Sequence, residues 1–168
     1  ALASGMRVNE ILNTHSTMTD PGTAELAADA ENAACFDNVT FTYRGAAAPS
    51  LTDISFTART GETIGIIGGT GSGKSTLIDL ICRFYDADNG GVTLFDYDVK
   101  QYSFAQLRGL VGIVPQQAVL FTGTIRDNMQ WAAPGATDEE IWQALEIAQA
   151  AEFVRGKPGM LDAPVETA

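Results

Sequence analysis

The sequence is poor in basic residues and in the side chains that bind metals. Ten lysines and arginines are set against 21 aspartates and glutamates, so the net charge at pH 7 is −11. Because a nucleic-acid-binding surface needs a basic patch, we expect no nucleic-acid partner. The only histidine is His15, and the two cysteines, Cys35 and Cys82, lie far apart in the chain. We therefore expect no zinc site, and we expect both thiols to be buried and reduced.

Long apolar runs are also missing. No run of about 18 apolar residues occurs, so we do not expect the chain itself to span a membrane. With 168 residues, 45% of them hydrophobic, the chain is long enough to bury a sizeable core, and this length is typical of one domain.

The most informative stretch is Gly68–Thr76, GGTGSGKST, which fits the phosphate-loop pattern G-x-x-x-x-G-K-[ST]. Glycines let several backbone N–H groups point into one concavity that can hold phosphate oxygens. Lys74 would reach the outer phosphates, and the Ser75 hydroxyl would bind Mg²⁺. Thr76 would contact the α-phosphate, although a polar residue there is also ordinary for a helix start. The nucleotide-binding residues predicted in this stretch are Gly69, Thr70, Gly71, Ser72, Gly73, Lys74, Ser75 and Thr76.

The neighbouring segments suit such a loop. The apolar run Glu62–Ile67 predicts a buried parallel strand, and apolar residues at helical spacing follow the loop. Leu110–Val114 predicts a second buried strand that ends at Pro115. Earlier in the chain, Phe36–Tyr43 and Leu51–Ala58 alternate in hydrophobicity and predict half-buried antiparallel strands. The pattern therefore predicts an α/β fold with a mixed sheet.

The remaining elements are predicted from shorter patterns. Val92–Phe95 predicts a strand, and helices are expected over Phe104–Gly109, Gly123–Trp131 and Thr137–Phe153, with Thr137 as the N-cap of the last. Ala1–His15 is typical of a helix end, and Met18–Asn32 of a linker, although a solvated tail explains both equally well.

Four stretches carry a likeness to a known family. They are the strand end Phe41–Tyr43, the loop, the segment LICRFY at Leu80–Tyr85, and the long segment LRGLVGIVPQQAVLFTGTIRDNM at Leu107–Met129. In this order they resemble the nucleotide-binding domain of ABC transporters, most closely the exporter type. The segment RVNEIL, Arg7–Leu12, resembles the junction where the last transmembrane helix of an exporter ends.

The resemblance implies roles for two further residues. Tyr43 would stack on the adenine of ATP, whereas its spacing alone favours the last position of a Val39-Phe41-Tyr43 core stripe. Gln116 would coordinate Mg²⁺ and touch the attacking water in the segment called the Q-loop. Gln117 is the competing choice, because the register is open at this point. Gln116 and Lys74 are the predicted catalytic residues.

The resemblance also implies a fold and a domain plan. We expect a P-loop NTPase-like core of parallel strands with a flanking antiparallel β subdomain, truncated before the signature motif of the family. Residues 1–32 would be the end of a transmembrane-domain helix plus a linker, and residues 33–168 an ATP-binding domain incomplete at its carboxyl end. The Walker B carboxylates and the switch histidine would also lie beyond the sequence. We therefore expect weak ATP binding or none, and negligible hydrolysis, from this chain alone.

For the parent protein, the resemblance implies an ATPase that couples ATP binding and hydrolysis to export. Its partners would be a transmembrane domain and a second nucleotide-binding domain, at the cytoplasmic face of the cell membrane. Two alternatives remain: a soluble P-loop kinase or GTPase, and a non-catalytic nucleotide-binding module. Asp88–Gly91 fits a loose GTPase pattern, but the guanine-reading Asn-Lys-x-Asp is absent. Val92–Asp96 superficially resembles a Mg²⁺-binding strand end, a reading that we discount.

Overall fold

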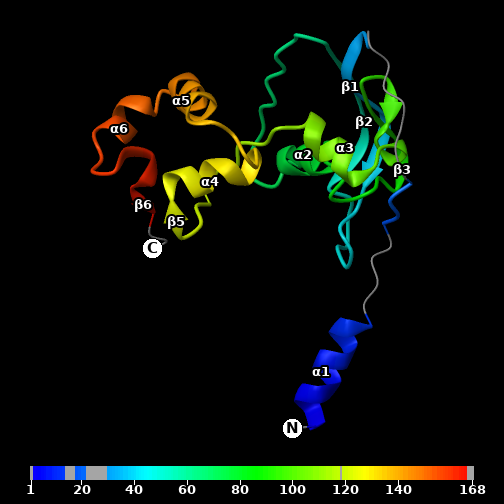
Figure 1. Ribbon diagram of the computed structural model, residues 1–168. Helices are drawn as coiled ribbons and strands as arrows, with labels where there is room; N and C mark the ends of the chain where they lie inside the picture. The colour runs from blue at the N-terminus through cyan, green and yellow to red at the C-terminus, as the bar shows by residue number, and fades with distance from the viewer. Residues whose placement is uncertain (1, 14–17, 22–29, 118, 166–168) are drawn as a thin grey trace. The chain divides into compact units, whose positions relative to one another are not determined.

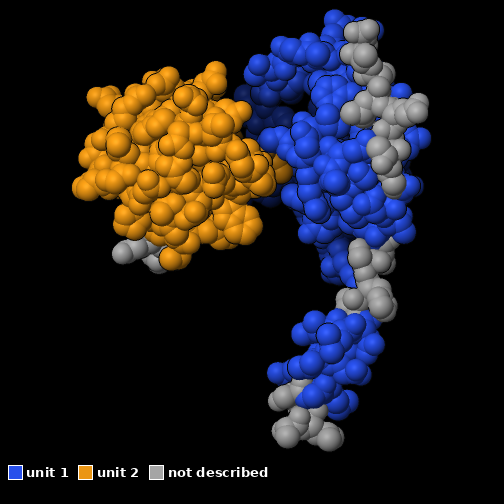
Figure 2. Space-filling model, viewed as in Figure 1, with its two compact units in different colours: residues 1–112 blue, residues 113–168 orange. Residues whose placement is uncertain are grey.

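The computed structural model describes residues 2–13, 18–21, 30–117 and 119–165. The chain divides into two compact units, residues 1–112 and residues 113–168 (Figure 2). The domain boundary predicted after residue 32 falls inside the first unit and stays a prediction. Among the described helices, none combines the length and the apolar character needed to cross a membrane.

A four-stranded antiparallel sheet forms the first unit, in the order β2-β1-β3-β4 (Figure 1). Its strands are β1 (Asn32–Phe41), β2 (Leu51–Arg59), β3 (Asn89–Leu94) and β4 (Tyr97–Asp98). Strand β1 is central and pairs with both β2 and β3, so that Phe36 lies opposite Phe56 on one side and Val92 on the other. The antiparallel strands predicted from alternation are therefore present.

A bulge in β1 changes which residues face the core. The register of β1 shifts between Phe36 and Val39 against β2, and Asn38 between them has φ 48°. An extra residue in a strand shifts the alternation of faces by one, so Phe36 and Val39 are both buried. Strand β3 passes close to this bulge at Gly90, where a Cβ would collide with the carbonyl oxygens of Asp37 and Asn38.

Two helices complete the core of the first unit. Helices α2 (Lys74–Ile81) and α3 (Phe104–Leu110) contribute Leu77, Leu80 and Leu107 to the same hydrophobic cluster as the sheet (Figure 1). The 3₁₀ turn η1 (Val99–Gln101) leads to Tyr102, which is fully buried and donates its hydroxyl proton to the Leu94 carbonyl oxygen. The amino-terminal helix α1 spans Leu2–Leu12, within the predicted range.

The two predicted parallel strands are not formed. Residues 62–69 have no strand pairing, and Leu110 closes α3 while residues 111–117 have no strand pairing either. The side chains of Ile67 and Val114 are 98% and 97% exposed. A parallel strand is held by neighbours on both edges and by helices on both faces, and the described residues bring no such neighbour to either segment. The described part of the chain therefore does not confirm the predicted parallel core.

The second unit is mainly helical. It contains α4 (Ile125–Ala132), α5 (Asp138–Ile147), α6 (Ala151–Arg155) and the 3₁₀ turn η2 (Met160–Asp162), closed by a small pair of strands, β5 (Gly123–Thr124) and β6 (Pro164–Val165). The helix predicted over Thr137–Phe153 is broken after Ile147, where Gln149 has φ 57°. The buried residues of its core are Ile141, Leu145, Ala151, Val154 and Leu161.

Polar contacts fix the ends of these helices. Thr137 is the N-cap of α5, as predicted, and forms a capping box with Glu140. Thr124 and Asp127 form the same motif at the start of α4. The backbone N–H of Thr124 lowers the pKa of Asp127, and that of Thr137 lowers the pKa of Glu140. Each carboxylate therefore binds an N–H donor just ahead of its helix, which stabilises its charged form.

Arg126 ties three elements of the second unit together. Its guanidinium on α4 bonds Asp162 of η2, with Nε to Oδ1 at 2.8 Å, and also pairs with Asp138 of α5. The hydrogen bond from Arg126 lowers the pKa of Asp162, and the two carboxylates raise the pKa of Arg126 further above its usual range.

Candidate functional site

The predicted phosphate loop forms a tight turn at the start of α2. Gly71 and Gly73 have φ of 79° and 87°, a backbone region that glycine adopts readily. At Gly73 a Cβ would also come within 2.6 Å of the Leu51 Cδ2 and 2.8 Å of the Ser50 carbonyl oxygen. Gly73 is the N-cap of α2 and provides no side-chain cap. The amide donors of the first turn of α2 thus lie at the mouth of the loop, where a helix N-terminus attracts anions.

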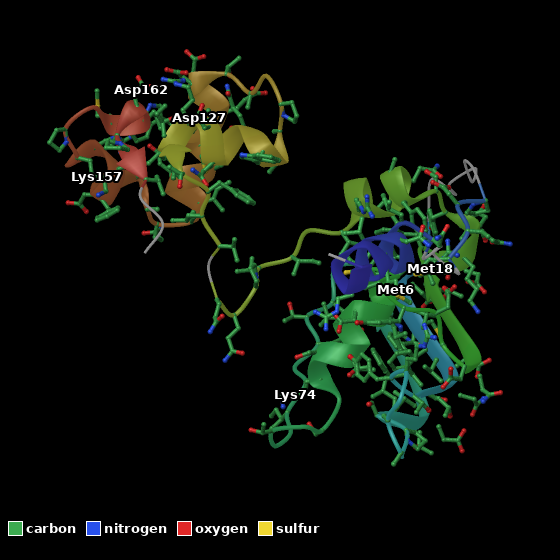
Figure 3. All side chains as sticks on the ribbon, turned by 90° about the horizontal axis from the view of Figure 1, so that it is seen from below. Met6, Met18, Lys74, Asp127, Lys157 and Asp162 are labelled. Carbon is green, nitrogen blue, oxygen red and sulfur yellow. The ribbon has the colours of Figure 1, made fainter. Side chains whose placement is uncertain are left out.

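Lys74 lies at the first position of α2, and its ammonium folds back over the loop (Figure 3). Its Nζ donates to the carbonyl oxygens of Gly68 at 2.9 Å and Gly69 at 2.7 Å, and to the Ser72 hydroxyl at 3.4 Å. These three partners are neutral oxygens. The positive charge is therefore held at the loop without a carboxylate counter-charge among its bonded partners, which leaves it suited to phosphate oxygens.

A cavity of about 220 Å³ lies against the loop. Tyr43 and the loop residues come together in its wall, although the two segments are separated in sequence. The lining residues are Tyr43, Ser50, Gly71, Ser72, Gly73, Lys74, Ser75 and Thr76. Gly69 and Thr70, also predicted, are exposed in the same loop outside this lining. A larger cavity of about 450 Å³ in the second unit includes no loop residue and is mainly apolar.

Tyr43 has features of both predicted roles. Its ring packs edge-on against Phe41 and Tyr85, with centroids 4.8 Å and 5.1 Å away, and it contacts the hydrophobic core. The ring is nevertheless only half-buried and lines the cavity. Its hydroxyl lies 3.1 Å from the Thr76 Oγ1 and 3.3 Å from the Asp79 Oδ2.

The two hydroxyl residues after Lys74 differ in accessibility. Ser75 is exposed, as a Mg²⁺ ligand requires, whereas Thr76 is only 5% exposed and its hydroxyl is bonded to Tyr43. A contact between Thr76 and the α-phosphate would therefore come through its backbone N–H, or would require its hydroxyl to turn from Tyr43.

Gln116 belongs to the second unit, and the loop to the first. Gln116 and Gln117 are both exposed on a segment without regular structure, so the choice between them stays a prediction.

The aspartates that superficially suggested other sites bind the backbone. Asp96 accepts from the Glu31 N–H at 3.1 Å and from the Asn32 side chain at 2.9 Å, and Asp88 accepts from the Thr42 N–H at 2.8 Å. They stabilise the ends of β1. In the described ranges no cluster of three or more histidine, cysteine or acidic residues is placed to hold a metal ion.

Sequence reasoning missed two residues of this region. Ser50 lines the cavity just before β2, and Asp79 reaches the Tyr43 hydroxyl from α2. The only sequence signal for Asp79 is its position three residues after Thr76, which puts both on one face of the helix. The approach of Tyr43 to that face is a tertiary contact that no local pattern indicates.

Comparisons with known proteins identify a family. The family model described as ABC transporter matches residues 51–163. An uncharacterised ABC transporter ATP-binding protein of Mycobacterium tuberculosis is 41% identical over 153 residues, 89% of this chain and 26% of the relative. A probable multidrug resistance ABC transporter ATP-binding/permease protein of Bacillus subtilis is 38% identical over 165 residues, covering 97% of this chain and 28% of the relative.

A lipid flippase and a solved structure add to these likenesses. The ATP-dependent lipid A-core flippase of Vibrio cholerae is 43% identical over 126 residues, 74% of this chain and 22% of the relative. The structure of a bacterial Atm1-family ABC exporter with ATP bound superposes with a TM-score of 0.85 and 32% identity, covering 98% of this chain and 29% of that chain.

The chain thus spans about a quarter of the length of these relatives. The likeness first indicated by the Gly68–Thr76 loop and the Leu107–Met129 segment is confirmed across most of the sequence. The ABC transporter family model covers residues 51–163, and the fold matches that of an ABC exporter, so the chain belongs to the ABC transporter ATP-binding family.

Proposed function

We propose that the chain provides the ATP-holding part of an ABC exporter. The observation that carries the proposal is the cavity in which Tyr43 lies with the loop residues Gly71–Thr76. In this arrangement the purine base of the nucleotide would stack on the Tyr43 ring, while the phosphates of the nucleotide would lie on the loop amides and on Lys74.

The residues present fit a Mg²⁺-bound triphosphate. Gly73 leaves the backbone open at the point where a side chain would collide, and Lys74 supplies the positive charge. The exposed Ser75 hydroxyl would hold Mg²⁺. Gln116 is proposed as a second oxygen ligand on the family resemblance alone. Bound Mg²⁺ neutralises charge on the transferring phosphoryl group. The chain's own residues orient the triphosphate and stabilise its charge.

Hydrolysis needs more than this cradle. A water-activating carboxylate is required, and the residues that line the cavity include none. We propose that this chain alone binds nucleotide weakly and hydrolyses it negligibly. In the parent transporter, partnership with a transmembrane domain and a second nucleotide-binding domain at the cytoplasmic face of the membrane would couple ATP use to export.

Titration of Mg-ATP into the wild-type chain and Lys74→Ala, followed by NMR chemical shifts, tests the site. We expect Lys74→Ala to weaken binding by about tenfold or more, since a charge-assisted hydrogen bond contributes about 1.5–3 kcal/mol. Lys100→Ala, at an exposed lysine in η1, is the matched control and should bind as the wild type does. Equal affinities for wild type and Lys74→Ala would overturn the proposal, and tighter binding of GTP than ATP would favour a GTPase instead.

A further inference from the structure

The Tyr43 side chain is restrained at both ends. Near its ring, Phe41 and Tyr85 pack edge-on, with interplanar angles of 82° and 88°. At its hydroxyl, Thr76 and Asp79 of α2 are both within hydrogen-bonding distance. A ring held only by apolar contacts can still tilt, whereas a bonded hydroxyl fixes the direction in which the ring points.

The hydrogen atoms of this group can be assigned from donor counts. A phenol hydroxyl has one proton, and a carboxylate only accepts. Tyr43 therefore donates to Asp79 at 3.3 Å, and Thr76 donates its hydroxyl proton to the Tyr43 oxygen at 3.1 Å. Asp79 is the final acceptor in this series of two hydrogen bonds. It therefore determines the order in which the hydroxyl groups donate their protons.

The same helix supports two parts of the site. Lys74, Ser75 and Thr76 form the first turn of α2, which lies at the loop, and Asp79 lies one turn further on, where it reaches Tyr43. Asp79 does not itself line the cavity, so its side chain acts on the cavity through Tyr43. Loss of the Asp79 carboxylate would remove one of the two hydrogen bonds that hold the Tyr43 hydroxyl, while the loop stays in place.

We propose that Asp79 is a positioning residue for the nucleotide base: it holds the Tyr43 hydroxyl and so presets the ring on which a purine stacks. This inference rests on the proposed ATP site. Preorganisation of a binding side chain raises affinity because less conformational entropy is lost on binding. The benefit concerns the base alone, since inorganic tripolyphosphate has no ring to stack.

The test compares Mg-ATP with Mg-tripolyphosphate on the 168-residue chain, again by NMR titration. We expect Asp79→Ala to weaken ATP binding about three- to tenfold and to leave tripolyphosphate binding unchanged. Asp79→Asn retains an acceptor oxygen and should recover most of the lost affinity. Glu139→Ala removes an exposed carboxylate from α5 and controls for the change in net charge.

Tyr43→Phe keeps the ring and removes the hydroxyl, so it should show the same selective loss as Asp79→Ala. It also decides the question if Asp79→Ala fails to fold. The double variant should lose no more than Tyr43→Phe alone, since Tyr43→Phe already removes the hydrogen bond to Asp79. Equal weakening of ATP and tripolyphosphate by Asp79→Ala would assign Asp79 a general structural role and overturn the inference, as would unchanged binding of both.

A different set of results would show that the proposed ATP site itself is wrong. If Lys74→Ala changes the binding of neither ligand, or if the wild type binds neither, the loop is not a phosphate site and the proposed function fails, and the inference with it. If Lys74→Ala weakens both ligands but Asp79→Ala and Tyr43→Phe change neither, the proposed function stands and the positioning role of Asp79 is refuted.

Discussion

The guanidinium of Arg83 donates to the backbone carbonyl oxygen of Thr19 at 3.1 Å, across 64 positions of sequence. Arg83 directly follows the C-cap of α2 and is only 5% exposed. Its Nε also bonds the Asp86 carboxylate at 3.0 Å, and its guanidinium lies over the Phe104 ring at 5.2 Å. The Phe104 N–H in turn donates to the Asp20 carboxylate at 3.4 Å. The segment at residues 18–21 is thus fastened to the core beside the end of the helix that begins at the phosphate loop.

The buried charge of Arg83 depends on Asp86. We expect Asp86→Ala to lower the free energy of unfolding by about 2 kcal/mol, because a buried guanidinium would lose its charged partner. Among the described residues its Nη1 already has no hydrogen-bond partner, so no spare acceptor is at hand to compensate. Urea unfolding followed by circular dichroism measures the change. Asp37→Ala, at an exposed aspartate of β1, is the control, and an equal effect of both would contradict the prediction.

Two features make Gly73 hard to replace: its positive φ and the lack of room for a side chain. Gly73→Ala places a methyl group 2.6 Å from Leu51 and 2.8 Å from the Ser50 carbonyl oxygen, at a φ of 87°. We expect a loss of about 1–3 kcal/mol in unfolding free energy, together with weaker Mg-ATP binding. Gly69→Ala is the matched control within the same loop, because a Cβ there meets nothing within 4 Å. A Gly73→Ala variant as stable as Gly69→Ala would show that the loop relaxes without cost.

The second unit should lose stability in acid. Arg126 lowers the pKa of Asp162, and helix-start N–H groups lower those of Asp127 and Glu140, so each folded pKa lies below the unfolded value of about 4. The unfolded state then binds more protons, so the stabilisation is present above about pH 4 and is lost as the pH falls through the folded pKa values.

Unfolding midpoints measured by circular dichroism between about pH 7 and pH 2 would show this trend. Asp162→Asn should lower stability at neutral pH and make the acid dependence shallower, because a side-chain amide at this position cannot titrate. An acid slope identical to that of the wild type would contradict the role of Asp162. The exposed Glu152→Ala serves as a carboxylate control in the same unit.

Several predictions that depend on near neighbours in the chain agree with the structure. Alternation identified β1 and β2, and Thr137 with Glu140 marked the start of α5. Two interruptions were missed, the bulge at Asn38 and the break at Gln149, both at residues with positive φ. Neither residue is a glycine, so the sequence provides no strong signal for a left-handed backbone there.

The strands expected at Glu62–Ile67 and Leu110–Val114 are not formed, for a different reason. Their apolar runs indicate burial, but burial in a sheet needs partner strands, and a local pattern contains no information about partners. Within the described residues the antiparallel sheet takes its partners from β1, β2, β3 and β4 alone.

The sequence by itself determined the family likeness and the match of Gly68–Thr76 to the phosphate-loop pattern, because that pattern places glycines, a lysine and hydroxyls at fixed short spacings. Only the tertiary structure decided that Tyr43 lies across the same cavity as Lys74, that Asp79 holds its hydroxyl, and that Arg83 fastens the Thr19 segment. The Tyr43–Asp79 and Arg83–Thr19 contacts join residues 36 and 64 positions apart. Such pairs form because the packed sheet and helices bring them within about 3 Å, the range in which hydrogen bonds act.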